Sequence, residues 1–112
     1  MRKLELVIRH SQVTAVKDAL VLLGIHGMSM VDIKGFGRQG GHREVYRGKE
    51  VVIEFVPKVK LEVVMEAQMV EEAIAAVRKA ACTGEVGDGK IFVLPVEEVV
   101  RIRTGERGRE AI

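Results

Sequence analysis

Apolar and polar residues alternate along several stretches of this 112-residue chain, a period of two that is typical of strands. Leu4, Leu6 and Ile8 share one face of the first stretch, and the other stretches show a similar alternation. The predicted strands are residues 3–8, 27–34, 51–64 and 90–95. Pro57 cannot donate a backbone hydrogen bond, so it indicates a bend or an edge position in the third strand.

Two other stretches repeat their apolar residues every three or four positions, which predicts amphipathic helices. The first contains Val13, Val16, Leu20 and Leu23, and the second, over residues 66–82, contains Val70, Ala73, Ile74, Val77 and Ala81. Ser11 is placed to cap the first helix and Gly24 to end it, while Thr83-Gly84 ends the second.

The element order is therefore β-α-β-β-α-β, which right-handed crossovers fold into an α+β, ferredoxin-like sandwich. Both helices should cover one face of a four-stranded sheet. Ser29, Val31 and Ile33 are expected to share one face of the second strand, and no further helix is predicted to cover the other face of the sheet. The Val- and Ile-rich composition of the strands predicts that this face is buried against other copies of the chain.

Length and charge fit one domain over residues 1–112. Eighteen Lys and Arg against 16 Asp and Glu give a net charge of +2, so neither a nucleic-acid nor an anionic-membrane partner is favoured. The single Cys82 cannot form an internal disulfide, and its place at the end of a helix suggests a structural residue in a reducing compartment. No signal peptide or apolar run of about 18 residues is recognisable, so a soluble, cytoplasmic protein without membrane insertion is expected.

The stretch from residue 35 to residue 50 is long for a connection between two strands. It holds several glycines, cations and Phe36, a composition that would suit a mobile arm docking into a partner, although a solvated loop would have similar residues. Gly35, Gly37 and Gly40 satisfy G-x-G-x-x-G, but no helix follows, which argues against a dinucleotide-binding motif.

A second glycine-rich stretch, residues 83–90, has the composition of a phosphate cradle that ends in Lys90. It resembles a P-loop, but Ile91 replaces the Ser or Thr that would bind magnesium and a strand follows instead of a helix. Arg101 and Arg103, alternating on a predicted strand, should point to one face and add positive charge. A glycine turn between a helix and a strand remains the alternative interpretation.

Three passages, at residues 34–39, 55–62 and 83–94 together with 101–106, resemble the PII nitrogen-regulatory signal proteins, and their spacing matches over the whole chain. The resemblance implies a homotrimer with a T-loop at about 37–55, a B-loop at about 82–90 and a C-loop at about 102–112. It also implies clefts between subunits that bind ATP or ADP and, with Mg²⁺ and ATP, 2-oxoglutarate.

The resemblance also implies which residues bind these effectors. For ATP or ADP they are Val7, Ser29, Gly35, Gly37, Arg38, Gln39, Glu62, Val64, Gly87, Asp88, Gly89, Lys90, Arg101 and Arg103. For 2-oxoglutarate they are Gln39, Gly41, Lys58 and Gly87, with Gln39 coordinating Mg²⁺ and Lys58 pairing with the distal carboxylate.

The chain departs from the family pattern at the usual modification positions. Val51 stands where many members carry the uridylylated tyrosine, and Lys49 where others carry a phosphorylated serine. Tyr46 matches a tyrosine that the family does not use in this way, so regulation should depend on ligands alone. Gly40 replaces a common lysine and makes the loop less charged.

These residues favour one of two classes of function, a regulatory binding module, over the other, an enzyme. A regulatory module would dock its T-loop onto a target, most simply an ammonium transporter, since Arg47 resembles the residue inserted into the transporter pore. A nitrogenase or a nitrogen-metabolism enzyme is the alternative target. An ATP-hydrolysing enzyme lacks a clear general base, because Asp88 lies within the cradle and His42 on the long loop, although slow hydrolysis is compatible with the sequence.

Overall fold

The computed structural model describes residues 1–36, 42–53 and 55–112, and the side chains of residues 42–44 and 51–53 are not considered. The elements follow in the order β1 (Arg2–Ile8), η1 (His10–Gln12), α1 (Val13–Leu22), β2 (Ser29–Gly35), β3 (His42–Tyr46), β4 (Lys49–Ile53), β5 (Val56–Met65), η2 (Ala67–Met69), α2 (Val70–Ala81), β6 (Gly89–Pro95) and η3 (Gly108–Ala111). The η elements are single 3₁₀ turns.

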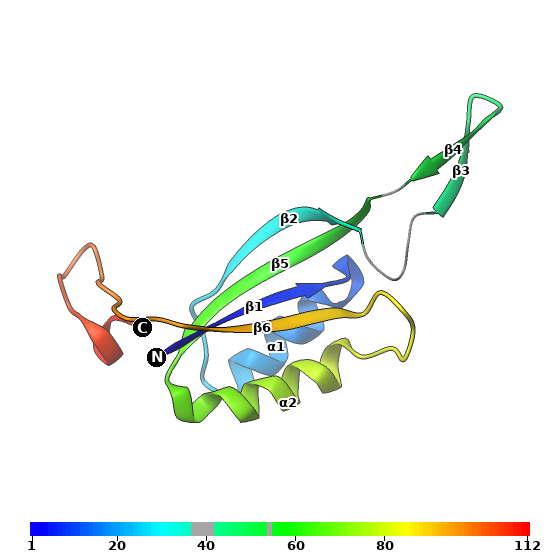
Figure 1. Cartoon of the computed structure of the whole chain (residues 1–112). Coiled ribbons are helices and arrows are strands. Elements are labelled where there is room, and N and C mark those ends of the chain that lie inside the picture. The colour runs from blue at the N-terminus through cyan, green and yellow to red at the C-terminus, as the bar shows by residue number, and fades with distance from the viewer. Residues whose placement is uncertain (37–41, 54) are drawn as a thin grey trace.

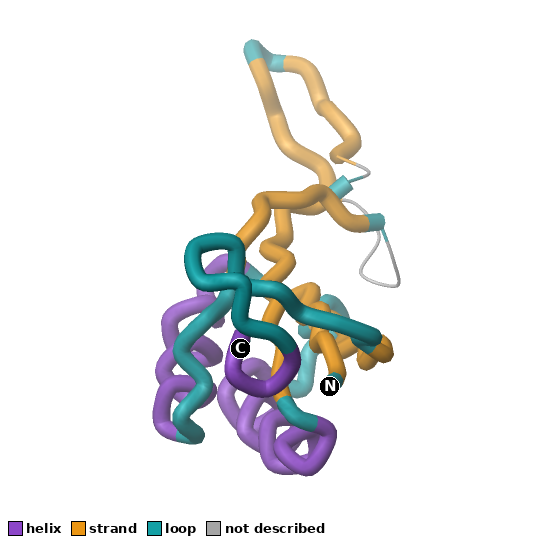
Figure 2. The backbone as a smooth tube through the Cα atoms, turned by 90° about the vertical axis from the view of Figure 1, so that its left-hand side faces the viewer, coloured by secondary structure: helices purple, strands orange, loops and turns teal. Residues whose placement is uncertain are grey.

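The main sheet has the order β2-β5-β1-β6, with all neighbouring strands antiparallel. α1 and α2 lie side by side on one face of this sheet (Figure 1), and the view turned by 90° shows the same two layers (Figure 2). The predicted ferredoxin-like α+β fold is confirmed.

The core lies between the sheet and the helices, and the predicted periodicities account for it. Leu4 and Leu6 of β1 are fully buried, as are Val16 and Leu20 of α1. From β5 and α2, the buried residues are Val59, Leu61, Val63, Met65, Val70, Ala73, Val77 and Ala81. Each large aliphatic side chain removed from water in this way stabilises the fold by roughly 1.5–3 kcal/mol.

No helix of the described residues covers the opposite face of the sheet, and the centre of this face is charged. Lys3 of β1 bonds to Glu5 at 3.1 Å and to Glu62 at 3.5 Å, and Lys60 bonds to Glu62 at 3.3 Å. Exposed apolar residues flank this network on the outer strands, including Val31 of β2, which shares the face with Ser29 and Ile33 as expected. The predicted association of copies through this face stays a prediction.

The prediction of a long loop between residues 35 and 50 is wrong for the second half of this stretch, because β3 and β4 pair there in a separate hairpin. Its turn, Arg47-Gly48, has φ values of 51° and 76°, the positive pair that a two-residue hairpin turn requires. The hairpin projects from the end of β2 and β5 (Figure 1). The strand predicted over residues 51–64 is confirmed as strand over residues 51–53 and 56–64, but these belong to two elements, β4 and β5, because Val51 pairs with Glu44 in the hairpin.

Smaller expectations about α1 and β5 had mixed outcomes. Ser11 does not cap α1, because it lies inside the 3₁₀ turn η1 and no side-chain capping bond is made at Gln12. Gly24 ends the helix as predicted, with φ of 85°. Pro57 occupies an edge position in effect, since it pairs with Lys34 on one side and lies beyond the end of β1 on the other.

The C-terminal segment turns back instead of continuing as a strand. Val100 forms an isolated bridge with Arg107, and residues 102–104 are a turn, so the prediction that Arg101 and Arg103 alternate on a strand is wrong. The bonds from Gly105 N to Arg101 O and from Arg101 N to Glu106 O close this turn. Among the residues that the structure describes, no helix is long and apolar enough to span a membrane.

Candidate functional site

The glycine-rich turn of residues 83–88, called here the cradle turn, is held against the end of β1 by Gly89. Gly89 pairs with Ile8 and has φ of 108°. A Cβ atom at this position would lie 1.7 Å from the carbonyl oxygen of Val7, a distance no real contact permits. Only glycine allows the two backbones to approach so closely, which fixes the cradle turn at this corner of the sheet.

The Asp88 carboxylate holds the cradle turn together from inside. It accepts hydrogen bonds from the backbone N–H of Thr83 at 2.8 Å, from that of Gly84 at 3.0 Å and from the Thr83 hydroxyl at 2.5 Å. Arg9 Nε donates to the same carboxylate at 3.3 Å. Hydrogen bonding from the Thr83 side chain, then from its backbone, is the main reason that the pKa of Asp88 falls to about 2.

Two basic side chains from other parts of the fold bind the carbonyl groups of the cradle turn. Arg9 Nη2 donates to the Val86 carbonyl at 2.8 Å, and Lys58 Nζ donates to the Gly87 carbonyl at 2.5 Å. Lys58 is 7% exposed. Burial lowers the pKa of Lys58, and the positive charge of Arg9 lowers it further, while Asp88 acts in the opposite direction.

A pocket of about 430 Å³ lies beside the cradle turn, between it, the sheet and the start of the segment leading to the hairpin. Seven predicted site residues line it: Val7, Gly35, Lys58, Gly87, Asp88, Gly89 and Lys90. Phe36, Glu85, Val86 and Phe92 complete the lining. The lining residues therefore come from four separate parts of the sequence, which become neighbours only in the folded chain.

Other predicted site residues lie elsewhere in the chain. Ser29 and Glu62 pair with each other farther along β2 and β5, and hydrogen bonding to Lys60 lowers the pKa of Glu62. Val64 lines a second pocket, of about 370 Å³, near the C-terminal residues. The predicted residues Gly37, Arg38, Gln39 and Gly41, like the departure at Gly40, lie outside the described residues.

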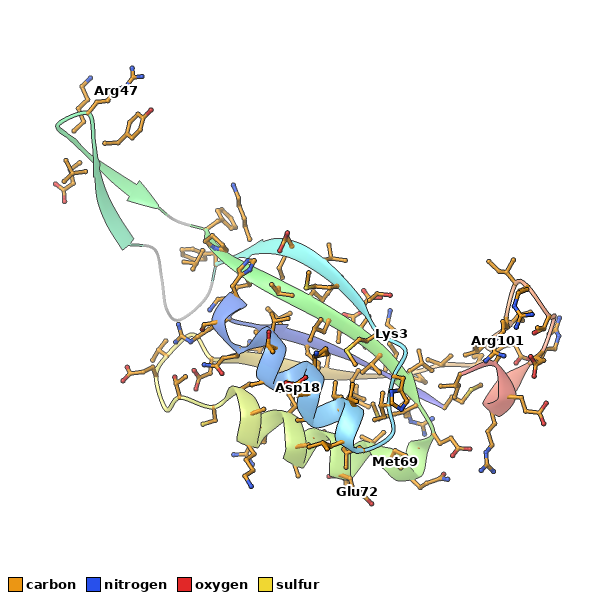
Figure 3. All side chains as sticks on the ribbon, turned by 180° about the vertical axis from the view of Figure 1, so that it is seen from behind. Lys3, Asp18, Arg47, Met69, Glu72 and Arg101 are labelled. Carbon is orange, nitrogen blue, oxygen red and sulfur yellow. The ribbon has the colours of Figure 1, made fainter. Side chains whose placement is uncertain are left out.

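Arg101 and Arg103 lie at the opposite end of the sheet from the cradle turn, as the place of Arg101 in Figure 3 makes clear. Arg101 pairs with Glu106 at 2.9 Å and Arg103 is exposed. Within a single chain, therefore, neither arginine reaches the pocket. Arg47 is at the tip of the hairpin (Figure 3), with its Cζ 5.4 Å from the centre of the Tyr46 ring.

The pocket has the chemistry of a site for an anion with an apolar part. Gly87, with φ of 103°, and Gly89 allow the backbone N–H groups of the cradle turn to converge, and Lys90 adds a positive charge. Phe36 and Phe92 give it apolar walls. The ionised Asp88 carboxylate is paired with Arg9 and hydrogen-bonded within the turn, so it braces the turn, and the contribution of this residue to binding an anion would come from its backbone.

Several residues around the pocket were not predicted from the sequence. Arg9 gave no pattern signal, because only the pairing of Ile8 with Gly89 brings the end of β1 to the cradle turn. Phe36 was noted as part of a loop; its ring centre lies 5.9 Å from that of Phe55, at the point where the hairpin segment returns to the sheet. Cys82, expected to be structural, is exposed at the end of α2.

Comparison with known proteins identifies the family of this fold and site. The profile of the family described as "Nitrogen regulatory protein P-II" matches residues 1–106. A protein of that name from Azospirillum brasilense is 59% identical over the full length of both chains, and one from Rhodospirillum rubrum is 54% identical over the same span. The chain belongs to the PII family.

Its fold is also that of a solved PII structure. The crystal structure of Arabidopsis thaliana PII bound to citrate superposes with a TM-score of 0.80 at 41% identity, covering 98% of this chain and 87% of the plant chain. As a PII protein, this chain is a regulatory signalling protein for nitrogen metabolism.

Proposed function

We propose that this PII protein senses ATP, ADP and 2-oxoglutarate and signals their levels by docking its hairpin onto a target protein. The observation that carries the proposal is the position of the pocket. Gly35 and Phe36 line it, and the same two residues lead from β2 into the segment that bears the hairpin. A ligand that displaces them therefore acts directly on the base of the projecting arm.

Nucleotide binding is supported by the convergence of the cradle turn and Lys90 on a pocket that also has apolar walls. Phosphate groups would bind to the N–H groups of residues 87–90 and to Lys90, with Gly35 allowing close approach. Ser29, Glu62 and Val64 continue from the pocket along the sheet and would serve the rest of the nucleotide. Gly37, Arg38 and Gln39 are proposed on sequence alone.

Arg101 and Arg103 enter the proposal through a second subunit. Because they lie at the far end of their own sheet, they would complete the nucleotide site of a neighbouring copy in a homotrimer. The uncovered sheet face, with its apolar flanks, offers a surface for that association. Light scattering tests the assembly: a trimer mass is expected at micromolar concentration, and a monomer would contradict it.

The proposal for 2-oxoglutarate rests on Lys58, a nearly buried cation in the pocket lining. Its ammonium would pair with the distal carboxylate, while Gly87 and Gly41 would approach with their backbones. Gln39 would hold Mg²⁺ between ATP and the keto acid, since amide, phosphate and carboxylate oxygens are the ligands that this cation prefers. The binding of citrate by the Arabidopsis relative is in keeping with a small-carboxylate ligand.

An ammonium transporter is the proposed target, because Arg47 at the tip of a narrow hairpin suits insertion into a pore. A nitrogenase or another nitrogen-metabolism enzyme is the alternative. Regulation would be by ligands alone, since Val51 and Lys49 carry no hydroxyl group. Finding uridylylated Tyr46 in cells would contradict this part of the proposal.

Isothermal titration calorimetry tests the sensing function. 2-Oxoglutarate should bind with Mg²⁺ and ATP present, and poorly with ADP or without the metal. Equal binding in all three conditions would overturn the proposed linkage. ATP turnover over minutes should be negligible; steady product formation would favour the weak-ATPase alternative.

A pull-down from native extract tests the docking, with ADP in one arm and Mg²⁺, ATP and 2-oxoglutarate in the other. A transporter should bind with ADP and be released by 2-oxoglutarate. Arg47→Ala and Arg47→Gly should both abolish capture without changing nucleotide affinity. Glycine accepts the φ of 51° at this position, so the second variant keeps the turn and isolates the loss of the guanidinium.

A further inference from the structure

Three successive residues of the cradle turn are held by basic side chains from distant parts of the sequence. Arg9 binds the Val86 carbonyl, Lys58 binds the Gly87 carbonyl and Arg9 also binds the Asp88 carboxylate. Arg9 follows β1 and is 79 positions from Asp88 in the sequence. It is absent from the described lining of the pocket, which distinguishes it from Lys58.

The two contacts of Arg9 need its forked shape. Nε is 3.3 Å from Asp88 Oδ1 and Nη2 is 2.8 Å from the Val86 oxygen, so one planar group holds two atoms at a fixed spacing. A lysine would bring the same charge but a single ammonium on a flexible stem. Charge and geometry can therefore be separated by substitution.

Holding the carbonyl groups also orients the donors of the cradle turn. In a trans peptide the C=O of one residue and the N–H of the next point in opposite directions. Fixing the Val86 and Gly87 carbonyls therefore fixes the N–H groups of Gly87 and Asp88. Without these contacts, Gly87, at φ of 103°, would have the wide conformational freedom of glycine.

We propose that Arg9 is a positioning residue of this site: its guanidinium holds the cradle turn in the conformation whose backbone N–H groups receive the phosphates, without contacting the ligand. The inference rests on the proposed nucleotide site. Its consequence is that a residue outside the pocket sets nucleotide affinity through the order of the turn before any ligand arrives.

The test uses the full-length protein with Arg9→Lys, Arg9→Gln, Asp88→Asn and the Arg9→Gln/Asp88→Asn double variant. Arg2→Lys, at the other end of β1, is the matched control. Hydrogen exchange of the ligand-free protein reports the Thr83 and Gly84 amides, which bond to Asp88. Calorimetry reports ATP affinity, and thermal unfolding confirms that each variant is folded.

Arg9→Lys should speed exchange at Thr83 and Gly84 and weaken ATP binding about fivefold to tenfold, although the charge is kept. Arg9→Gln and Asp88→Asn should each do at least as much, and the double variant should do less than the sum of the two, because both substitutions break the same contact between Arg9 and Asp88. Arg2→Lys should behave as the wild type.

Two results would overturn the inference. One is an Arg9→Lys variant with wild-type exchange and wild-type affinity. The other is weaker ATP binding with unchanged exchange and additive effects in the double variant, which would make Arg9 a ligand contact. If the wild type itself binds no nucleotide, the proposed function fails, while exchange in the ligand-free variants still decides whether Arg9 braces the turn.

Discussion

The cradle turn and the β3–β4 hairpin are both glycine-containing connections, yet the fold treats them in opposite ways. The turn is held by bonds to Arg9 and Lys58, by its internal bond between Thr83 and Asp88, and by the close packing of Gly89 on β1. The strands of the hairpin pair only with each other within the described residues, and the hairpin extends away from the sheet (Figure 1). The signalling that we propose would use both, with the turn as a fixed receptor for the ligand and the hairpin as a movable arm.

The contrast has an energetic basis. Hydrogen bonds to charged groups inside the turn oppose local opening, so we expect the turn to unfold together with the sheet. A two-stranded hairpin with exposed Val45 and Tyr46 gains little from burial and is marginally stable by itself. We therefore expect ligands to change the arm and leave the turn almost unchanged.

The largest expected effect is on stability and ATP binding, and it distinguishes a closely packed glycine, Gly89, from an open one, Gly84. Gly89→Ala must move the backbone of Val7 as well as hold alanine at φ of 108°, so it should cost more than about 3 kcal/mol of unfolding free energy and abolish ATP binding. Urea unfolding and calorimetry measure these losses. Gly84→Ala is the control, since φ of 84° strains it but no atom lies within 4 Å of the new Cβ, and it should cost only about 1 kcal/mol.

Lys58→Ala tests the specificity of the pocket. It would remove the proposed charge-assisted pairing of Lys58 with a carboxylate and should cost roughly 1.5–3 kcal/mol of 2-oxoglutarate affinity, with a much smaller change for ATP. Lys60→Ala is matched to it, because Lys60 lies two residues along the same face of β5 and pairs with Glu62 instead. Equal losses of the two ligands in Lys58→Ala would show that the side chain acts only through the cradle turn.

The sequence predicted the sandwich well because its helices and strands bury one face each. Leu4 and Val16 occupy the core positions that their periodicities assign. The sequence also predicted the cradle turn, because the positive φ angles at Gly87 and Gly89 favour glycine, and these glycines are visible in the sequence. These are local signals, and the fold preserves them.

What the sequence did not reveal depends on tertiary neighbours. Arg9 becomes part of the site only through the strand pairing that brings β1 to β6. The hairpin was missed because its turn begins with Arg47 at positive φ, where asparagine or glycine is the usual signal. The Arg101-x-Arg103 alternation was misread as a strand, since Gly105 and Glu106 close a turn around it.

Gly48→Ala tests the independence of the arm. Alanine at φ of 76° should destabilise the hairpin by about 1 kcal/mol, without any steric contact, because nothing lies within 4 Å of the new Cβ. Faster hydrogen exchange over residues 42–53 is expected, with no change in the global unfolding free energy. A lower global stability would show that the hairpin and the sheet unfold as one unit, so that the arm would not be independent.

The smallest expected effect is a loss of unfolding free energy in acid, which arises from Asp88 of the cradle turn alone. The pKa of Asp88 is about 2 in the folded protein against an ordinary 3.8, so the folded state binds fewer protons than the unfolded state between these values. The stability that Asp88 contributes is complete above about pH 3.8 and is lost as the pH falls through about 2. Urea unfolding at a series of pH values measures this slope, which Asp88→Asn should flatten. Asp18→Asn, on the exposed side of α1, should keep it, and an unchanged slope in Asp88→Asn would mean that the carboxylate does not hold the cradle turn in solution.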